Sequence, residues 1–244
     1  MNYSPIALAI LSISLMPLAG CSKKTEAKTA EASLSSALSP EKAGEAVQQA
    51  RLSNLPQADA STPLASYYPL NSGNDLMFMY YAMSGIPPEI DKIAEKYSSE
   101  YRQSSDAFRK QDLLTALKPR IEGELATGKT RHYFSYDIEQ SLKHYDFAKK
   151  QFPLSSGLRP DALWYMNDNS DYKLDFTNAG SFQQINVADE TKARAIEKMV
   201  GGYQSFVLRL YAFAQDVDIN KTHLKAQIVK VSLLDKQGNE LVAQ

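Results

Sequence analysis

One stretch of the chain gathers the residue types that acid–base or metal chemistry requires. In RHYFSYDIEQSLKHYDF, two histidines and two aspartates lie close together: His132, Asp137, His144 and Asp146. Imidazoles and carboxylates are zinc ligands, and a histidine beside a carboxylate is a usual acid–base pair. No HExxH spacing supports either role, so the alternative is two half-buried histidines among tyrosines, with aspartates at the surface. The stretch from His132 to Asp146 is therefore the candidate site of a hydrolase.

The only cysteine of the chain closes the motif Leu18-Ala19-Gly20-Cys21, directly after an apolar segment. Residues 1–20 carry no charged side chain. Their apolar run has the length of a signal-peptide core and is too short to span a bilayer as a helix. The motif resembles the lipobox of bacterial lipoprotein precursors. In that family the signal is cut before the cysteine, here between Gly20 and Cys21, and the thiol receives a diacylglyceryl group.

The lipoprotein resemblance implies that Cys21 anchors the protein to a membrane of the cell envelope. A further acyl chain such as palmitate on the freed amine would make the anchor stable, because one chain binds a membrane only marginally. In a Gram-negative host, Ser22 in place of Asp resembles the pattern sent to the outer membrane, facing the periplasm. One departure is the lack of Lys or Arg before the apolar run. The alternative is an ordinary cleaved signal followed by a chance cysteine.

A nucleotide-binding motif occurs at Gly123–Thr130, which matches GxxxxGK[ST] in full. Such a loop cradles phosphates when a strand leads into it and a helix follows. Here a helical pattern leads in and a strand-like pattern leaves from Arg131. We therefore expect a turn at a helix end, and no nucleotide.

Two other motifs are incomplete. Asp216-Val217-Asp218-Ile219-Asn220 begins like a calcium loop, but Lys221 replaces the required Gly and Gln227 the required Glu. Ser39-Pro40-Glu41-Lys42 matches the Ser-x-x-Lys of penicillin-binding enzymes without its partner motifs. A weak, improvised calcium site stays open as an alternative, but the sequence predicts no metal and no cofactor.

Composition bounds the class of protein. The chain is 43% hydrophobic and 23% charged, which is ordinary for a folded domain. Its net charge of -1 gives no basic surplus for nucleic acid. Fourteen tyrosines suit a half-exposed sheet or a binding face, since tyrosine can bury its ring and keep its hydroxyl wet.

The lipobox resemblance and the change in composition after it predict three segments: a signal peptide at 1–20, a lipidated cysteine with a disordered tether at 21–66, and one globular domain at 67–244. The tether is rich in Ala, Ser, Lys and Glu and has too few large apolar residues to order itself. Within it, a short helix could begin at Ser39-Pro40-Glu41.

The domain begins with helical patterns and continues with strand patterns. An apolar run at Leu76–Met83, helical spacing over Ile90–Tyr101, and a helix after Ser105 that Pro119 should kink or divide come first. Later segments alternate or end at turns, with one helix capped by Asp189. The strand-like segments are 132–138, 162–166, 172–176, 182–187, 203–217, 224–234 and a short one after residue 239. The sequence thus predicts an α+β fold: N-terminal helices, then a mainly antiparallel sheet with one further helix.

A second resemblance rests on AMSGIPPEIDKIAEKY, FRKQDLLTALKPRIEGEL and HYDFAKKQFPL. These stretches are similar to an uncharacterised domain-of-unknown-function family of bacterial envelope proteins. The likeness implies a single envelope domain and assigns no catalytic residue.

Two functions from different classes remain. The first is a non-enzymatic binding or assembly component that presents a tyrosine-bearing sheet to an envelope protein or to the cell wall. The second is an envelope hydrolase that works through the His132–Asp146 site. They differ in whether His132 and His144 meet in space. A solute-binding subunit of a transporter is disfavoured, because the two-lobed α/β alternation is missing.

Overall fold

The computed structural model describes residues 52–244. These residues form five α-helices, nine strands and two short 3-10 helices. In chain order the elements are η1 Leu64–Ser66, β1 Tyr68–Pro69, α3 Gly73–Ser84, α4 Ile90–Tyr97, α5 Ser99–Gln103, α6 Ala107–Gly128, β2 Tyr133–Gln140, β3 Gln151–Pro153, β4 Leu163–Met166, β5 Asn169–Phe176, η2 Ala179–Phe182, β6 Gln184–Asn186, α7 Glu190–Gly201, β7 Phe206–Asp218, β8 His223–Leu234 and β9 Glu240–Ala243.

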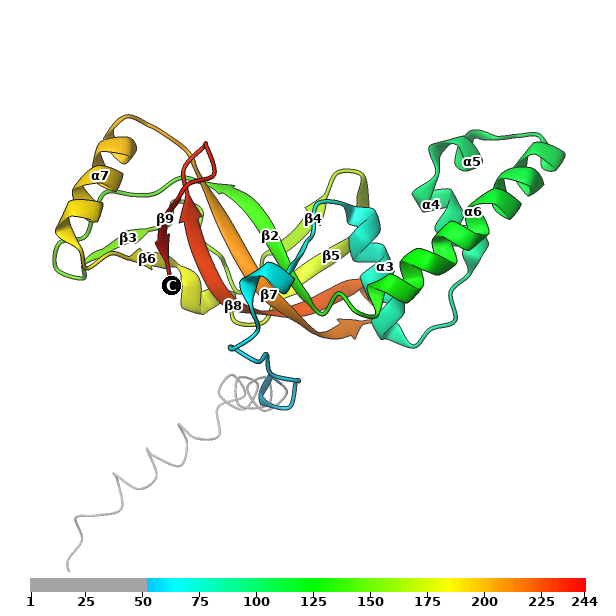
Figure 1. The fold of residues 1–244 in the computed structure, drawn as a ribbon, viewed down its shortest axis with the longest axis horizontal. Coiled ribbons are helices and arrows are strands. Elements are labelled where there is room, and N and C mark those ends of the chain that lie inside the picture. The colour runs from blue at the N-terminus through cyan, green and yellow to red at the C-terminus, as the bar shows by residue number, and fades with distance from the viewer. Residues whose placement is uncertain (1–51) are drawn as a thin grey trace, which may run out of the picture. The chain divides into compact units, whose positions relative to one another are not determined.

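Seven strands form one sheet in the order β1-β2-β7-β8-β5-β4, with β9 also paired to β8 (Figure 1). Strand β8 is long enough to pair with two strands besides β7. Strand β5 pairs with its first residues, His223–Ala226, and β9 with its last, Ser232–Leu234. Strands β3 and β6 form a separate two-stranded sheet.

The predicted arrangement of N-terminal helices followed by a mainly antiparallel sheet is wrong. The fold is α+β, but the sheet is mixed, because β1 runs parallel to β2 and β5 runs parallel to β8. The further helix predicted after Asp189 is α7, which lies between β6 and β7, so the helices are not all N-terminal. Parallel neighbours need a long crossover, which residues 70–132 and 177–222 supply. Alternating side chains indicate a strand but not the direction of its neighbour.

Most elements nevertheless lie where local patterns place them. The apolar run after Ser72 is α3, whose first turn is capped when the Ser72 hydroxyl accepts a hydrogen bond from the Asn74 amide. Helix α6 is not divided at Pro119 but continues through it. Pro119 deprives the Thr115 carbonyl of its helical donor, and both residues are exposed, so solvent can replace that hydrogen bond.

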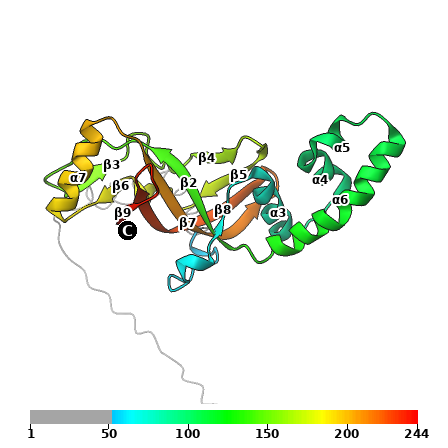
Figure 2. The same cartoon turned by 45° about the horizontal axis from the view of Figure 1, so that its top comes forward.

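The core lies mainly between α3 and the sheet. Helix α3 packs on β5, β7 and β8, while α6 packs against α3 and α4 against α6. The β3–β6 pair and α7 lie at the other end of the sheet (Figures 1 and 2). Among residues 52–244, no helix combines the length and apolar character needed to cross a bilayer.

Candidate functional site

The structure does not assemble the predicted His132–Asp146 site. His132 and His144 flank opposite ends of β2, whose eight residues span roughly 26 Å at about 3.3 Å per residue. Asp137 is held instead by Arg209 on β7, whose Nε and Nη2 donate to the two carboxylate oxygens at 2.7 Å each. The hydrolase hypothesis thereby loses the histidine pair on which it rested.

The other residues and motifs singled out in the sequence do not form a site in the described part of the chain. Gly20 and Cys21 lie outside the described residues, as does most of the tether. Gly123 lies inside α6 and the motif ends in the turn after it, so a helix leads into the match and phosphates find no helix N-terminus there. Across residues 52–244, no cluster of three or more His, Cys, Asp or Glu side chains could hold a metal ion.

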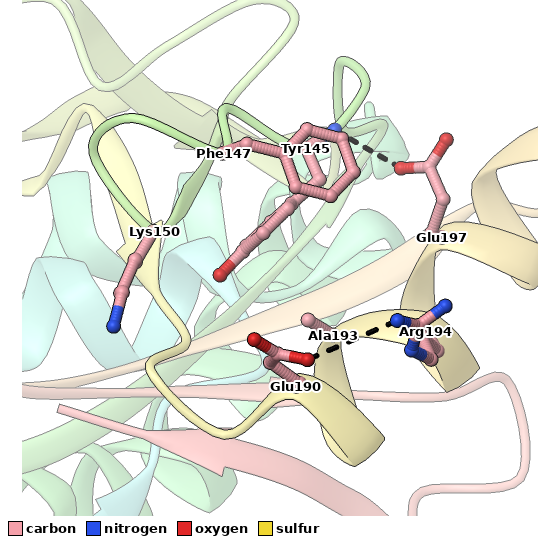
Figure 3. A pocket seen from close by; sticks show the side chains of 7 residues that line it. All are labelled: Tyr145, Phe147, Lys150, Glu190, Ala193, Arg194 and Glu197. Atoms are coloured by element: carbon pink, nitrogen blue, oxygen red, sulfur yellow. Dashed lines mark hydrogen bonds and ion pairs between the residues drawn. The ribbon is translucent and has the colours of Figure 1, made fainter.

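A pocket of about 390 Å³ lies between the loop that follows β2 and one face of α7 (Figure 3). Its volume falls within the range of small-molecule sites, about 300–1,000 Å³. The residues that line it are Tyr145, Phe147, Lys150, Glu190, Ala193, Arg194 and Glu197.

A tight hairpin forms the loop side of the pocket. Asp146 and Gln151 pair as antiparallel neighbours, with amide-to-carbonyl distances of 2.8 and 3.3 Å. The Asp146 carboxylate accepts hydrogen bonds from the amides of Ala148 and Lys149 at 3.0 and 3.1 Å. Asp146 therefore shapes the turn that carries Phe147 and Lys150 and does not itself face the pocket as an acid or base.

Tyr145 connects the pocket to the protein core. Its hydroxyl donates to the Val187 carbonyl at 2.7 Å, and its ring lies 4.9 Å from that of Phe152, which is fully buried. The Phe147 ring stands edge-on to Tyr145, with ring centres 5.1 Å apart and an interplanar angle of 84°. Phe147 is 80% exposed, so this second ring is an open wall of the pocket.

Helix α7 provides the opposite side. Asp189 caps it, because its carboxylate accepts hydrogen bonds from the amides of Thr191 and Lys192. Ala193 and Arg194 lie three and four residues after Glu190, and Glu197 lies four and three residues after them, which places all four on one face of the helix. Ala193 is buried, and its small side chain leaves room for the pocket.

Glu197 binds the hairpin to α7. One carboxylate oxygen lies 2.6 Å from His144 Nδ1, and the other accepts a hydrogen bond from the Tyr145 amide at 3.0 Å. Partial burial opposes the charge, but the hydrogen bonds from His144 and the Tyr145 amide lower the pKa of Glu197 below its ordinary value. Glu197 is therefore ionised at neutral pH, and both of its oxygens are occupied.

The lining of the pocket contains few of the side chains most often used in catalysis. None of its seven lining residues is Ser, Thr, Cys or His, whereas Lys150, Glu190 and Glu197 belong to types that can also act as bases or nucleophiles. The tyrosine hydroxyl is taken up by the Val187 carbonyl. What remains is an aromatic wall with charged side chains around it, which suits recognition of a small ligand.

A second aromatic group, the tyrosine cluster, consists of Tyr67, Tyr133 and Tyr211 on the sheet. The Tyr67 ring lies 5.3 Å from each of the other two, edge-on to both. The segment just before it crosses the cluster, since the Asp59 amide donates to the Tyr133 hydroxyl at 2.7 Å. Tyr67 is only 6% exposed, and its burial raises the pKa of its phenol. The chain itself therefore covers part of the tyrosine-bearing face.

Residues 89–198 match the model of a family described as a domain of unknown function (DUF4852). All seven residues that line the pocket lie within the matched region. No curated protein and no solved structure matches the chain. The match supports the family resemblance inferred from the sequence and leaves the activity unassigned.

Sequence reasoning found one neighbour of the pocket, His144, and missed the residues that line it. A usable signal was present on α7, where Glu190, Arg194 and Glu197 recur at helical spacing. Nothing in the sequence indicated that this face would meet the hairpin, because His144 and Glu197 are 53 positions apart.

Proposed function

We propose that the protein is a lipoprotein of the bacterial cell envelope, and that its domain is a non-enzymatic binding component. In this proposal residues 1–20 are the export signal, and lipid on Cys21 holds the mature chain in the outer membrane, facing the periplasm. The support for this location is the Leu18-Ala19-Gly20-Cys21 motif after an uncharged apolar segment.

The observation that carries the binding role is the pocket between the hairpin and α7. It has an exposed aromatic wall, charged side chains around it, and no Ser, Thr, Cys or His among its lining residues. The separation of His132 from His144 removes the arrangement that favoured a hydrolase. Binding is therefore the function that the geometry supports best.

Mass spectrometry of the N-terminal peptide tests the anchor. We expect a mature chain that begins at an acylated Cys21 and sediments with membranes. We also expect Cys21→Ser to accumulate as an uncleaved precursor. A mature chain with a free thiol in the soluble fraction would contradict the anchor.

Photo-crosslinking in intact cells tests the binding role. A photoreactive amino acid at position 147 should capture an envelope component, and the same amino acid at position 203 should not. The two positions form a matched pair, since Phe147 is 80% and Tyr203 98% exposed, and Tyr203 does not line the pocket. Loss of the product in Cys21→Ser would tie binding to the anchored form. Equal capture at both positions would contradict a specific pocket.

A further inference from the structure

We infer that the pocket selects a small anionic ligand in which a carboxylate is joined to an apolar or ring-shaped group. This inference deepens the proposed binding role and rests on it. It follows from which charged groups around the pocket are already paired and which are open.

The two cationic side chains of the pocket, Lys150 and Arg194, have hydrogen-bond donors that no protein group within residues 52–244 uses. Lys150 makes no ion pair or hydrogen bond through its ammonium group within the part of the chain that the structure describes. Arg194 lies 3.8 Å from Glu190, and both side chains are about 80% exposed, so water screens that pair. A guanidinium has five N–H donors in a fork that matches a carboxylate. Most of the Arg194 donors remain available to a ligand.

The two carboxylates differ in their availability. Glu197 uses both oxygens within the protein, on His144 and on the Tyr145 amide. Glu190 is far more exposed than Glu197, with side-chain exposures of 80% and 35%, and its one ion-pair contact among the described residues is with Arg194 (Figure 3). The two cations and two carboxylates of the lining balance in formal charge, so the preference for an anion rests on hydrogen bonding. Within the described chain, Lys150 and Arg194 have free donors, whereas Glu190 is the one carboxylate of the lining with both oxygens free of hydrogen bonds.

The aromatic walls of the pocket indicate that the ligand has an apolar group next to its carboxylate. Tyr145 and Phe147 meet at 84°, which forms an aromatic corner over the buried Ala193. Because the Tyr145 hydroxyl is bonded to Val187, the ring presents carbon atoms rather than a polar group. A methyl group or the face of a sugar ring can pack into such a corner.

The backbone at Lys150 supports a role for its side chain. Lys150 has φ 54°, in the left-handed region where glycine or asparagine is the usual residue. Lysine is therefore not the residue that the turn itself favours, whereas its charge is what an anion site needs.

Two sources in the cell wall offer this chemistry, and a titration can tell them apart. N-acetylmuramic acid has a carboxylate on a methyl-bearing arm of a sugar ring, and an N-acyl-D-alanyl-D-alanine peptide has one beside a methyl group. N-acetylglucosamine is the matched sugar without a carboxylate. Calorimetry on the mature domain should give saturable binding of one carboxylate probe. That probe should bind at least about tenfold more tightly than N-acetylglucosamine.

The variants Lys150→Asn and Lys149→Asn sharpen this test, because they make the same substitution at adjacent exposed positions and only Lys150 lines the pocket. We expect Lys150→Asn to weaken carboxylate binding about tenfold and Lys149→Asn to leave it unchanged. Asparagine tolerates the left-handed backbone, so the turn is preserved.

The outcomes separate the ligand class from the binding role. If N-acetylglucosamine binds as tightly as the carboxylate probes, or if both lysine variants lose affinity equally, the anion class is wrong although the pocket binds. If neither carboxylate probe binds up to about 10 mM, the ligand class is overturned. If a probe binds and is then consumed during the titration, the ligand class stands and the non-enzymatic role fails.

Discussion

The tyrosine cluster on the sheet and the pocket beside α7 both bring aromatic rings to about the same separation. Tyr67 lies 5.3 Å from Tyr133 and from Tyr211, and Tyr145 lies 5.1 Å from Phe147. Their exposure differs sharply, since Tyr67 is 6% exposed and Phe147 80%. The chain covers the first group with its own segment and leaves the second open. Ring content alone therefore does not identify a binding face, and the exposed fraction has to be considered with it.

The largest difference should appear when an aromatic ring is removed from the tyrosine cluster. We expect Tyr67→Ala to lower the free energy of unfolding by about 3–4 kcal/mol, because it leaves a cavity between two rings. Urea denaturation measures this change. Tyr203→Ala is the control: it removes the same side chain where it is 98% exposed, and should change stability by less than about 0.5 kcal/mol. Equal effects would mean that the cluster is not part of the core.

The next largest effect should come from Glu197→Gln, which weakens the link between the hairpin and α7. We expect a loss of about 1 kcal/mol at pH 7, after allowance for the partial exposure of this carboxylate. Because the pKa of Glu197 is lowered in the folded state, its contribution is present above the ordinary pKa of 4.5. It is lost as the pH falls through the folded pKa. Denaturation curves of the two proteins should thus converge in acid, and a gap that widens there would contradict the assignment.

Phe147→Ala should affect stability less, in contrast to Tyr67→Ala. We expect a change within about 0.5 kcal/mol, because the ring is 80% exposed and buries little area on folding. The same variant should lose the ligand. If Phe147→Ala unfolds as readily as Tyr67→Ala, the Phe147 ring stabilises the fold, and its assignment as a ligand-binding wall of the pocket is wrong.

The smallest expected effect is an increase in stability. Lys150→Asn replaces a lysine at φ 54° with a residue that tolerates the left-handed region, and should raise stability by up to about 0.5 kcal/mol. The melting temperature relative to Lys149→Asn measures this gain. A stability gain with a loss of ligand affinity would show that Lys150 is kept for binding, whereas a clear loss of stability would show a structural role.

Local signals in the sequence were enough for most elements of the fold. The apolar run of α3, the Asp189 cap of α7 and the turn before β5 are each set by neighbours within a few positions. Strand directions were not predictable in this way. The pairing of β5 with β8 depends on a crossover through α7 and β7, and no residue within β5 records it.

The pocket shows more clearly that contacts between residues far apart in the sequence cannot be predicted from local patterns. His144 was identified as a candidate for the right reason, since a histidine does meet a carboxylate there, but the predicted partners were wrong. Its partner is Glu197, which comes close only when the hairpin packs on α7. Asp137 and Asp146, which are near in sequence, are engaged by Arg209 and by the turn amides.

Amide chemical-shift mapping by NMR tests the binding pocket most directly. The mature domain would be titrated with the carboxylate probe that binds in calorimetry, and the shifted amides assigned. We expect the moved signals to come from residues 145–150 and 190–197, with Lys150, Ala193 and Arg194 among the largest. If the signals that move belong instead to the sheet around Tyr133 and Tyr211, the binding face is the tyrosine cluster, and the pocket beside α7 is not the site.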